Sequence, residues 1–310
     1  MNTFDRLKLV ASIDTIQDFD ESQFEKIVKD GNTAYKFYQE TPYLLVIKIN
    51  YSEHEVVVEF TGKVLGKDYP KLISSATIRQ CFQNINASGI INLDIDAMMD
   101  ADVVRCDVTK DILVEDVPRL TRYVRNHISN YQKYTCRKLP NNNLVVEKNV
   151  TTDEIKKRMT IYDKGNEMRK KANQRFVEAY GLHGAFDGVC RFEINLNSKE
   201  QIRTSLGISD TKLESVLASE ANPIQDFLDV VVDATSTPNT ISDRKCYYTM
   251  LVLKDCDYDL EKVEAKMRQL YPSRGSNIKA IMQPFRQMME RLNSPAESDL
   301  WEDVHRQLSR

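Results

Sequence analysis

Residues 189–195 alternate apolar and polar side chains, and this pattern constrains the fold more than any other feature of the sequence. In an extended strand Cys190 and Phe192 face one side, whereas Arg191 and Glu193 face the other, with an asparagine two residues further on. Burying such a polar row would require every charge to be paired. The alternation therefore predicts a sheet with one apolar face and a second face that is either exposed to solvent or part of a functional site.

The other hydrophobic patterns predict an α+β fold. We expect strands at residues 4–14, 43–51, 55–61, 103–108, 144–148, 157–163 and 189–195, and helices at 21–28, 75–86, 114–129 and 167–180. These elements form two similar blocks, which suggests two fused ferredoxin- or RRM-like halves that share an antiparallel sheet.

The chain changes character after residue 208. Five helices are expected there, at residues 210–219, 224–232, 260–270, 278–292 and 299–308, while 247–253 fits either a strand or a buried helix. We therefore expect an α+β domain at 1–208, followed by a mainly helical C-terminal region at 209–310.

Composition indicates the class of protein. The 310 residues are 41% hydrophobic, enough for a substantial core, yet no apolar run approaches the ~18 residues of a membrane span. The first residues lack the charged and apolar regions of a signal peptide. Six cysteines are scattered without a Cys-x-x-Cys pair, which favours reduced thiols over a zinc site. We expect a soluble cytoplasmic protein without a membrane partner.

Positive charge is concentrated in one part of the chain. Residues 117–175 contain fifteen Lys/Arg and five Asp/Glu, an excess of ten positive charges in a chain whose net charge is −3. Such a segment favours a phosphate-backbone partner, although any single lysine is more often part of a solvated helix face. The candidate nucleic-acid-binding residues are Arg119, Arg122, Arg125, Lys133, Arg137, Lys138, Lys156, Lys157, Arg158, Arg169, Lys170, Lys171 and Arg175.

Tyr162 lies in this basic segment and is the candidate nucleophile. It stands in a short strand two residues before Lys164, and the strands on either side of it in the sequence carry lone carboxylates, Asp107 and Glu193. Transfer of a phosphodiester to tyrosine needs a hydroxyl that attacks phosphorus, and a metal and a cation that offset the charge. Glu167 is either a first-turn helix residue that favours the helix dipole or a third metal ligand.

These motifs resemble one family when they are taken in order. Arg105-Cys106-Asp107, Tyr162-Asp163-Lys164 and Arg191-Phe192-Glu193 are similar to the motifs of rolling-circle replication initiators, namely the gene II/X proteins of filamentous phages and the initiators of staphylococcal-type plasmids. The resemblance covers residues 100–208, about a third of the chain.

The resemblance implies a phage or plasmid initiator that nicks one strand at an origin. Tyr162 would be the catalytic nucleophile, Lys164 and Arg191 would steady the phosphate, and Asp107 and Glu193 would hold Mg²⁺ or Mn²⁺, with Glu167 as a further ligand. The implied partners are single-stranded or hairpin origin DNA and the helicase and polymerase of a bacterial host, and a homodimer is possible.

Two alternatives remain open at this point. The charge distribution fits a non-catalytic origin- or RNA-binding protein equally well, and the carboxylates fit a metal nuclease that activates water. The chain also departs from the HUH endonucleases, whose metal is held by two histidines, because its four histidines are isolated. A metal here would be bound by carboxylates, which favours Mg²⁺ or Mn²⁺ over zinc.

Overall fold

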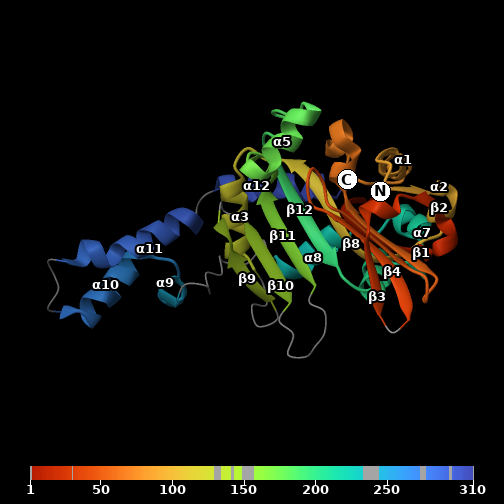
Figure 1. Cartoon of the computed structure of the whole chain (residues 1–310). Helices are drawn as coiled ribbons and strands as arrows, with labels where there is room; N and C mark the ends of the chain where they lie inside the picture. The colour runs from red at the N-terminus through yellow and green to blue at the C-terminus, as the bar shows by residue number, and fades with distance from the viewer. Residues whose placement is uncertain are drawn as a thin grey trace.

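A ten-stranded antiparallel sheet dominates the computed structural model, which describes residues 2–29, 31–128, 134–140, 143–148, 157–232, 244–272, 277–292 and 295–309. The sheet order is β3-β4-β5-β6-β1-β8-β12-β11-β10-β9 (Figure 1). The strands are β1 (Thr3–Ser12), β3 (Glu25–Lys29), β4 (Asn32–Gln39), β5 (Leu45–Asn50), β6 (Glu55–Thr61), β8 (Asp102–Leu113), β9 (Tyr134–Lys138), β10 (Leu144–Lys148), β11 (Arg158–Asp163) and β12 (Val189–Leu196). A separate ribbon pairs β2 (Ile16–Phe19) with β7 (Ile91–Leu93).

The large sheet consists of two halves with the same strand order. Outward from the centre, one half runs β1-β6-β5-β4-β3 and the other β8-β12-β11-β10-β9, so each first strand pairs with the last strand of its own half. The halves join where β1 pairs with β8. The α+β class and the shared antiparallel sheet are thus confirmed. The ferredoxin-like strand order is not observed. In that order the first strand of a half lies between two other strands of the same half. Here the first strand β8 has only β12 as a neighbour from its own half, and β12 separates β8 from β11.

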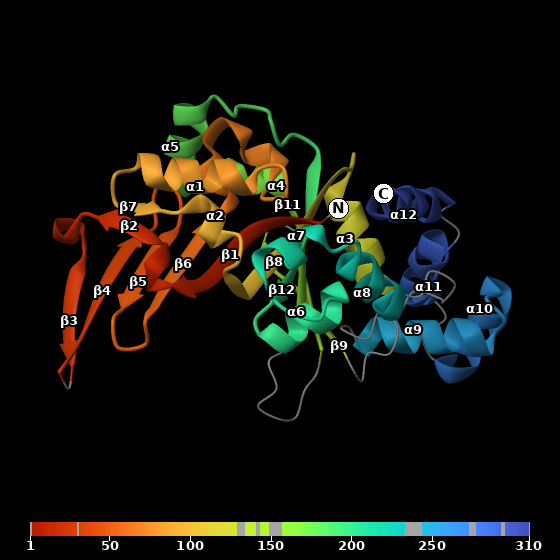
Figure 2. The same ribbon diagram turned by 90° about the vertical axis from the view of Figure 1, so that its right-hand side faces the viewer.

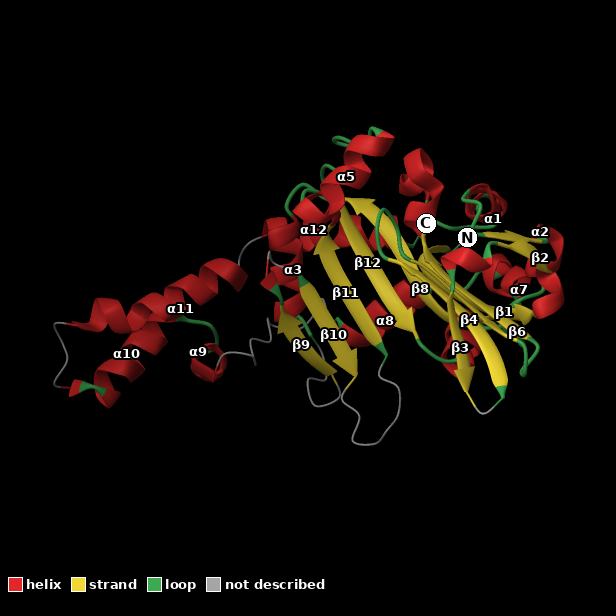
Figure 3. Cartoon of the chain, viewed as in Figure 1, coloured by secondary structure: helices red, strands yellow, loops and turns green. Residues whose placement is uncertain are grey.

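Helices pack on one face of this sheet, as the alternation of residues 189–195 predicts. Phe192 on β12, Val108 on β8 and Phe60 on β6 are fully or almost fully buried in one continuous core with Phe82 of α1 and Leu228 of α8. Figures 2 and 3 show the helices gathered against the sheet. They are α1 (Ile78–Ala87), α2 (Ile95–Met98), α3 (Val117–Asn126), α6 (Lys199–Leu206), α7 (Leu213–Ala218), α8 (Pro223–Val231) and α12 (Pro295–Leu308).

The opposite face of the sheet is polar over most of its width. Strand register aligns Arg158 of β11 with Asn195 of β12, Asp107 of β8 and Arg6 of β1 in one row across the sheet. In Figure 1, α8 lies behind the strands of the second half, so the viewer looks onto this polar face. A small cap covers one end of it, formed by the 3-10 segment η3 (Gly62–Lys71) with α4 (Lys164–Met168) and α5 (Lys171–Tyr180).

The structure overturns one local expectation, adds a strand that was not predicted and decides one open alternative. The helix expected at residues 21–28 is wrong: a single 3-10 turn precedes β3, whose β-branched Ile27 and Val28 pair with β4. The missed strand β4 follows a turn at Gly31, which has φ = 80°. Residues 247–253 belong to helix α9 (Arg244–Asp255).

Residues 209–310 are mainly helical and contribute to two cores. α7, α8 and α12 belong to the core beneath the sheet. By contrast α9, α10 (Leu260–Leu270) and α11 (Ile278–Leu292) have a core of their own around Leu253, Met267 and Met282, and they project from the body of the molecule (Figure 1). Across the described residues, the helices are all too short or too polar to cross a membrane.

Removing the indole of Trp301 should weaken the packing of α12 on the core beneath the sheet. Trp301 is 6% exposed and stacks on Tyr123 of α3 with ring centroids 5.6 Å apart. We expect Trp301→Ala to lower the free energy of unfolding by about 3–5 kcal/mol in urea denaturation. The neighbouring exposed Glu302 is the control, since Glu302→Ala should stay within about 0.5 kcal/mol. Equal effects of the two changes would contradict this packing.

Candidate active site

The candidate site centres on Tyr162, whose hydroxyl donates a hydrogen bond to Oε1 of Glu193 at 2.8 Å. Tyr162 on β11 pairs directly with Arg191 on β12, and Glu193 lies two residues further along β12 on the same face. The side chain of Tyr162 is 8% exposed. The structure therefore brings together the tyrosine and one of the carboxylates that the sequence motifs single out.

Arg191 is fully buried beneath this pair and is surrounded by acceptors. Its guanidinium forms two parallel bonds to Asp111, at 2.6 and 2.7 Å, and contacts the Tyr69 hydroxyl at 3.0 Å and Asp5 at 3.1 Å. Glu193 lies 3.9 Å away. A buried cation is tolerated only when it is paired in this way, so Arg191 fixes the positions of the acids around it.

A β-bulge brings Asp5 into the site. The register between β1 and β8 shifts between Phe4 and Arg6, so Asp5 is the extra residue on β1. Its carboxylate faces Arg191 on the polar side of the sheet, and Oδ1 is buried without a hydrogen bond. The bulge thus adds a third carboxylate near Glu193 and Asp107.

The cap supplies the second buried cation, Lys164. Its Nζ bonds to Glu167 at 2.9 Å, and it lies 5.1 Å from the ring centroid of Tyr69 and 5.7 Å from that of Tyr162. A side chain at Gly165 would come within 2.7 Å of the Phe186 carbonyl oxygen, so glycine allows α4 to pack this closely. The cap therefore holds a positive charge directly over the tyrosine.

The two central acids differ in proton affinity. Burial, reinforced by the negative charge of Asp5, raises the pKa of Glu193 to about 7. Burial opposes ionisation of Asp5 too, but Arg191 and Lys164 outweigh it and hold the pKa of Asp5 below its usual value. Asp5 is thus the permanent anion of the pair, whereas Glu193 gains and loses a proton near neutral pH.

The phenol itself is difficult to ionise in the free protein. Burial, together with the neighbouring Glu193 carboxylate, raises the pKa of Tyr162 well above its ordinary value. The tyrosine is therefore protonated at neutral pH, and Glu193 is the acceptor that its hydroxyl hydrogen already faces.

The three proposed metal ligands are not gathered at one point. Asp107 accepts a hydrogen bond from Asn195 at 2.8 Å and lies diagonally across from Glu193 on the adjacent strand. Glu167 is turned to the other side of Lys164, where Asn173 also donates to it. Within the described ranges no three His, Cys, Asp or Glu side chains are arranged to hold a metal ion.

The basic segment is divided between different surfaces. Arg119, Arg122 and Arg125 lie on α3, which packs against the apolar face of the sheet. Arg137 and Arg158 lie on β9 and β11 and belong to the polar face. The other described members are Lys138 on β9, Lys157 beside β11, and Arg169, Lys170, Lys171 and Arg175 in or beside the cap helices. Lys133 and Lys156 lie outside the described residues.

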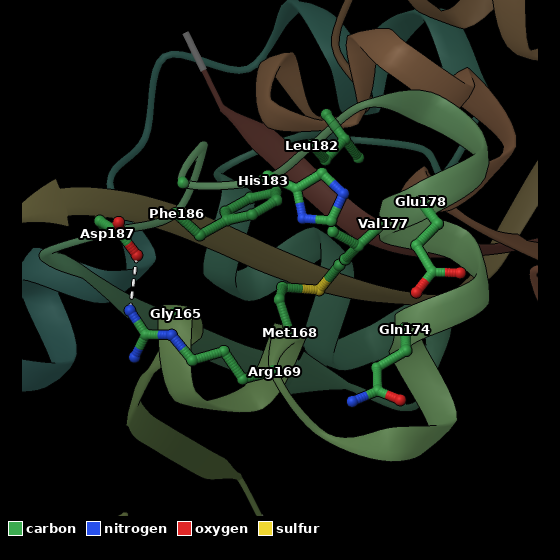
Figure 4. Close-up of a pocket in the computed structure, with 11 residues that line it drawn as sticks. Gly165, Met168, Arg169, Gln174, Val177, Glu178, Leu182, His183, Phe186 and Asp187 are labelled. Atoms are coloured by element: carbon green, nitrogen blue, oxygen red, sulfur yellow. Dashed lines mark hydrogen bonds and ion pairs between the residues drawn. The ribbon is translucent and has the colours of Figure 1, made fainter.

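A cavity of about 430 Å³ opens beside the cap (Figure 4). Arg169, Gln174, His183 and Asp187 line it, and Arg169 forms an exposed ion pair with Asp187 at 2.6 Å. Neither Tyr162 nor its partner Glu193 is among the lining residues, so the cavity lies next to the candidate site rather than within it.

Sequence reasoning missed three members of the site: Asp5, Tyr69 and Asp111. Asp111 follows Asp107 at a spacing of four along β8, so a longer strand with the same alternation would have identified it. Asp5 depends on a bulge and Tyr69 on the path of η3, and neither leaves a periodic signal in the sequence.

Comparison with known proteins identifies no relative. No protein-family model matches the sequence, and neither the curated proteins nor the solved structures give a significant match.

The pairing of Arg191 can be tested by a change at Asp111. Asp111→Ala removes the bidentate partner of the fully buried Arg191 and should lower the free energy of unfolding by about 3–5 kcal/mol. Asp187→Ala is the matched control: its ion pair with Arg169 has the same 2.6 Å separation but is exposed, so the loss should stay within about 1 kcal/mol. Urea denaturation of both variants makes the comparison, and similar losses would contradict the network described above.

Proposed function

We propose that this protein nicks one strand of DNA by transferring a phosphodiester to Tyr162, and that the nick starts rolling-circle replication of a phage or plasmid. The Tyr162 oxygen attacks phosphorus and forms a phosphotyrosine bond to the 5′ side of the cut. The bond from phosphorus to the 3′ oxygen breaks, and that oxygen takes a proton from water and leaves as a free 3′ hydroxyl that a polymerase can extend.

One observation supports this proposal above all others, the hydrogen bond from Tyr162 to Glu193. A structural tyrosine would be satisfied by any acceptor. Here the acceptor is a partly buried carboxylate whose pKa of about 7 lies where a general base is most effective. Glu193 can take the proton of Tyr162 during attack and return it when the strand is rejoined.

The two buried cations have different roles in this scheme. Lys164 lies over the rings of Tyr162 and Tyr69, where its charge offsets the negative charge that develops as the phenol loses its proton. Arg191 has all its described contacts with Asp111, Asp5, Tyr69 and Glu193. It therefore acts mainly by holding Glu193 in place. Its positive charge would also stabilise the negative charge of the phosphate from the buried side of the site.

Mg²⁺ or Mn²⁺ remains part of the proposal, with Asp107 and Glu193 as its ligands. Both carboxylates lie on the polar face, and Oδ1 of Asp5, which is paired with Arg191 at 3.1 Å, lies nearby, so the donor set suits a hard divalent cation. A bound ion would draw charge from the phosphate oxygens. Glu167 is engaged by Lys164 and would have to turn away from it to join the set.

The proposed partners follow from the reaction. The substrate would be single-stranded or hairpin origin DNA in the cytoplasm of a bacterial host, whose helicase and polymerase would extend the nick. A second subunit of a homodimer could perform the second transfer.

Replacing the nucleophile tests the proposal directly. The protein is incubated with labelled single-stranded and supercoiled origin-library DNA and Mn²⁺, and the products are separated on a denaturing gel. We expect a covalent protein–DNA adduct with the wild type and none with Tyr162→Phe, which lacks the attacking oxygen. Tyr180→Phe is the control, because Tyr180 lies in the same basic segment but is 36% exposed on α5, away from Glu193.

The other outcomes separate the competing functions. Cutting that persists in Tyr162→Phe without any adduct identifies a nuclease that uses water. Binding without cutting under every condition identifies a non-catalytic DNA- or RNA-binding protein.

The proton acceptor predicts a pH dependence. Glu193 accepts a proton only when it is ionised, so adduct formation should rise with pH and then level off. A cation bound to the same carboxylate favours its ionisation and would move this rise below pH 7. In Glu193→Gln this rise should disappear and the rate at the plateau should fall by roughly 10²–10⁴-fold. Single-turnover rates at fixed Mn²⁺ concentration give the comparison. A Glu193→Gln variant that keeps the wild-type plateau rate and the wild-type pH profile contradicts this role.

A further inference from the structure

Three arginines on the polar face have unsatisfied donors. Arg6 on β1, Arg105 on β8 and Arg158 on β11 are the described arginines whose Nε is buried without a hydrogen-bond acceptor. Their side chains nevertheless remain 27%, 33% and 41% exposed. A guanidinium has five N–H donors, so the exposed part of each of these side chains can still bind an anion that arrives from solvent.

The carboxylates of the sheet do not satisfy these donors. Nε of Arg158 lies 3.7 Å from Glu147, and Nε of Arg105 lies 4.0 Å from Asp107, both too far for a hydrogen bond. Arg6 bonds to Glu59 through its terminal nitrogen rather than through Nε.

Strand register places these arginines along one path. Arg158 and Arg6 lie in the same row across the sheet, three strand spacings apart, or about 14 Å. Arg105 pairs with Lys8 in the next row. The path passes Asn195, which is two residues from Glu193, so it runs beside the candidate active site.

The same face extends away from the site with positive charge and one exposed aromatic ring. Register places Tyr38 of β4 in the same row as Lys8 and Arg105, and Tyr38 is 59% exposed. Lys36 of β4 and Lys48 of β5 pair with each other in the next row of the same face, two residues from Tyr38 along β4. Guanidinium and ammonium groups next to an exposed ring can hold a phosphate backbone and stack an unpaired base.

Building on the proposed nicking function, we propose that a single DNA strand crosses the polar face along this path, with its phosphates on Arg158, Arg105 and Arg6 and a base on Tyr38. The strand then leads to the Tyr162 hydroxyl beside the cap. The arginines of α3 lie on the other side of the sheet and take no part in this path.

The test measures binding separately from cutting. The affinity for a short fluorescein-labelled oligothymidylate is measured by anisotropy at several salt concentrations, in a Tyr162→Phe background that cannot form an adduct. Arg105→Gln with Arg158→Gln should weaken binding and reduce the slope of log affinity against log salt by about 1.4, since two phosphate contacts are lost. Arg158→Gln alone, at the most exposed of the three, should reduce the slope by about 0.7. The single variant tests the path if the double variant does not fold.

The matched control changes the same charge on the opposite side of the sheet. Arg203→Gln with Lys212→Gln removes two half-exposed cations of α6 and the start of α7, and should leave the slope unchanged. An unaltered slope in the sheet-face variants, or an equal reduction in the control, overturns the path. Adduct formation by the wild type is scored separately, so a failure of nicking is not confused with a failure of the path.

Discussion

The buried guanidinium of Arg191 is the interaction on which the rest of the site depends. It joins β12 to β8 through Asp111, to the β1 bulge through Asp5, and to the cap through Tyr69. Because an unpaired charge at this depth would be strongly unfavourable, these elements are held in one arrangement. The same arrangement places two acids together, and their mutual repulsion and burial give Glu193 a proton affinity suited to neutral pH.

The duplicated strand order explains where the site lies. In each half the last strand pairs with one edge of the first strand. The other edges of the first strands β1 and β8 pair with each other at the centre of the sheet. The helices pack on the apolar face, and on the polar face η3, α4 and α5 cover one end. Tyr162 lies at the border between the cap and the polar face, which is where the proposed DNA strand would reach it.

Alternation and motif order predicted the α+β class, the one-sided sheet and the meeting of Tyr162 with Glu193, because these features depend on local periodicity. The residues of the basic segment 117–175 are close in sequence, but α3 and β11 carry them to opposite faces of the sheet. Asp5 was missed because a β-bulge turns its side chain to the polar face, whereas strict alternation with the rest of β1 places it on the apolar face. The strand order of each half depends on pairings between distant segments, which local patterns do not encode.

The most direct measurement identifies the residue that becomes attached to DNA. Wild-type protein is incubated with single-stranded DNA and Mn²⁺, digested with nuclease and trypsin, and the nucleotide-bearing peptide is sequenced by mass spectrometry. This account predicts a nucleotide on Tyr162, in the tryptic peptide of residues 159–164. A nucleotide on any other side chain, or DNA cleavage without a modified peptide, would contradict it.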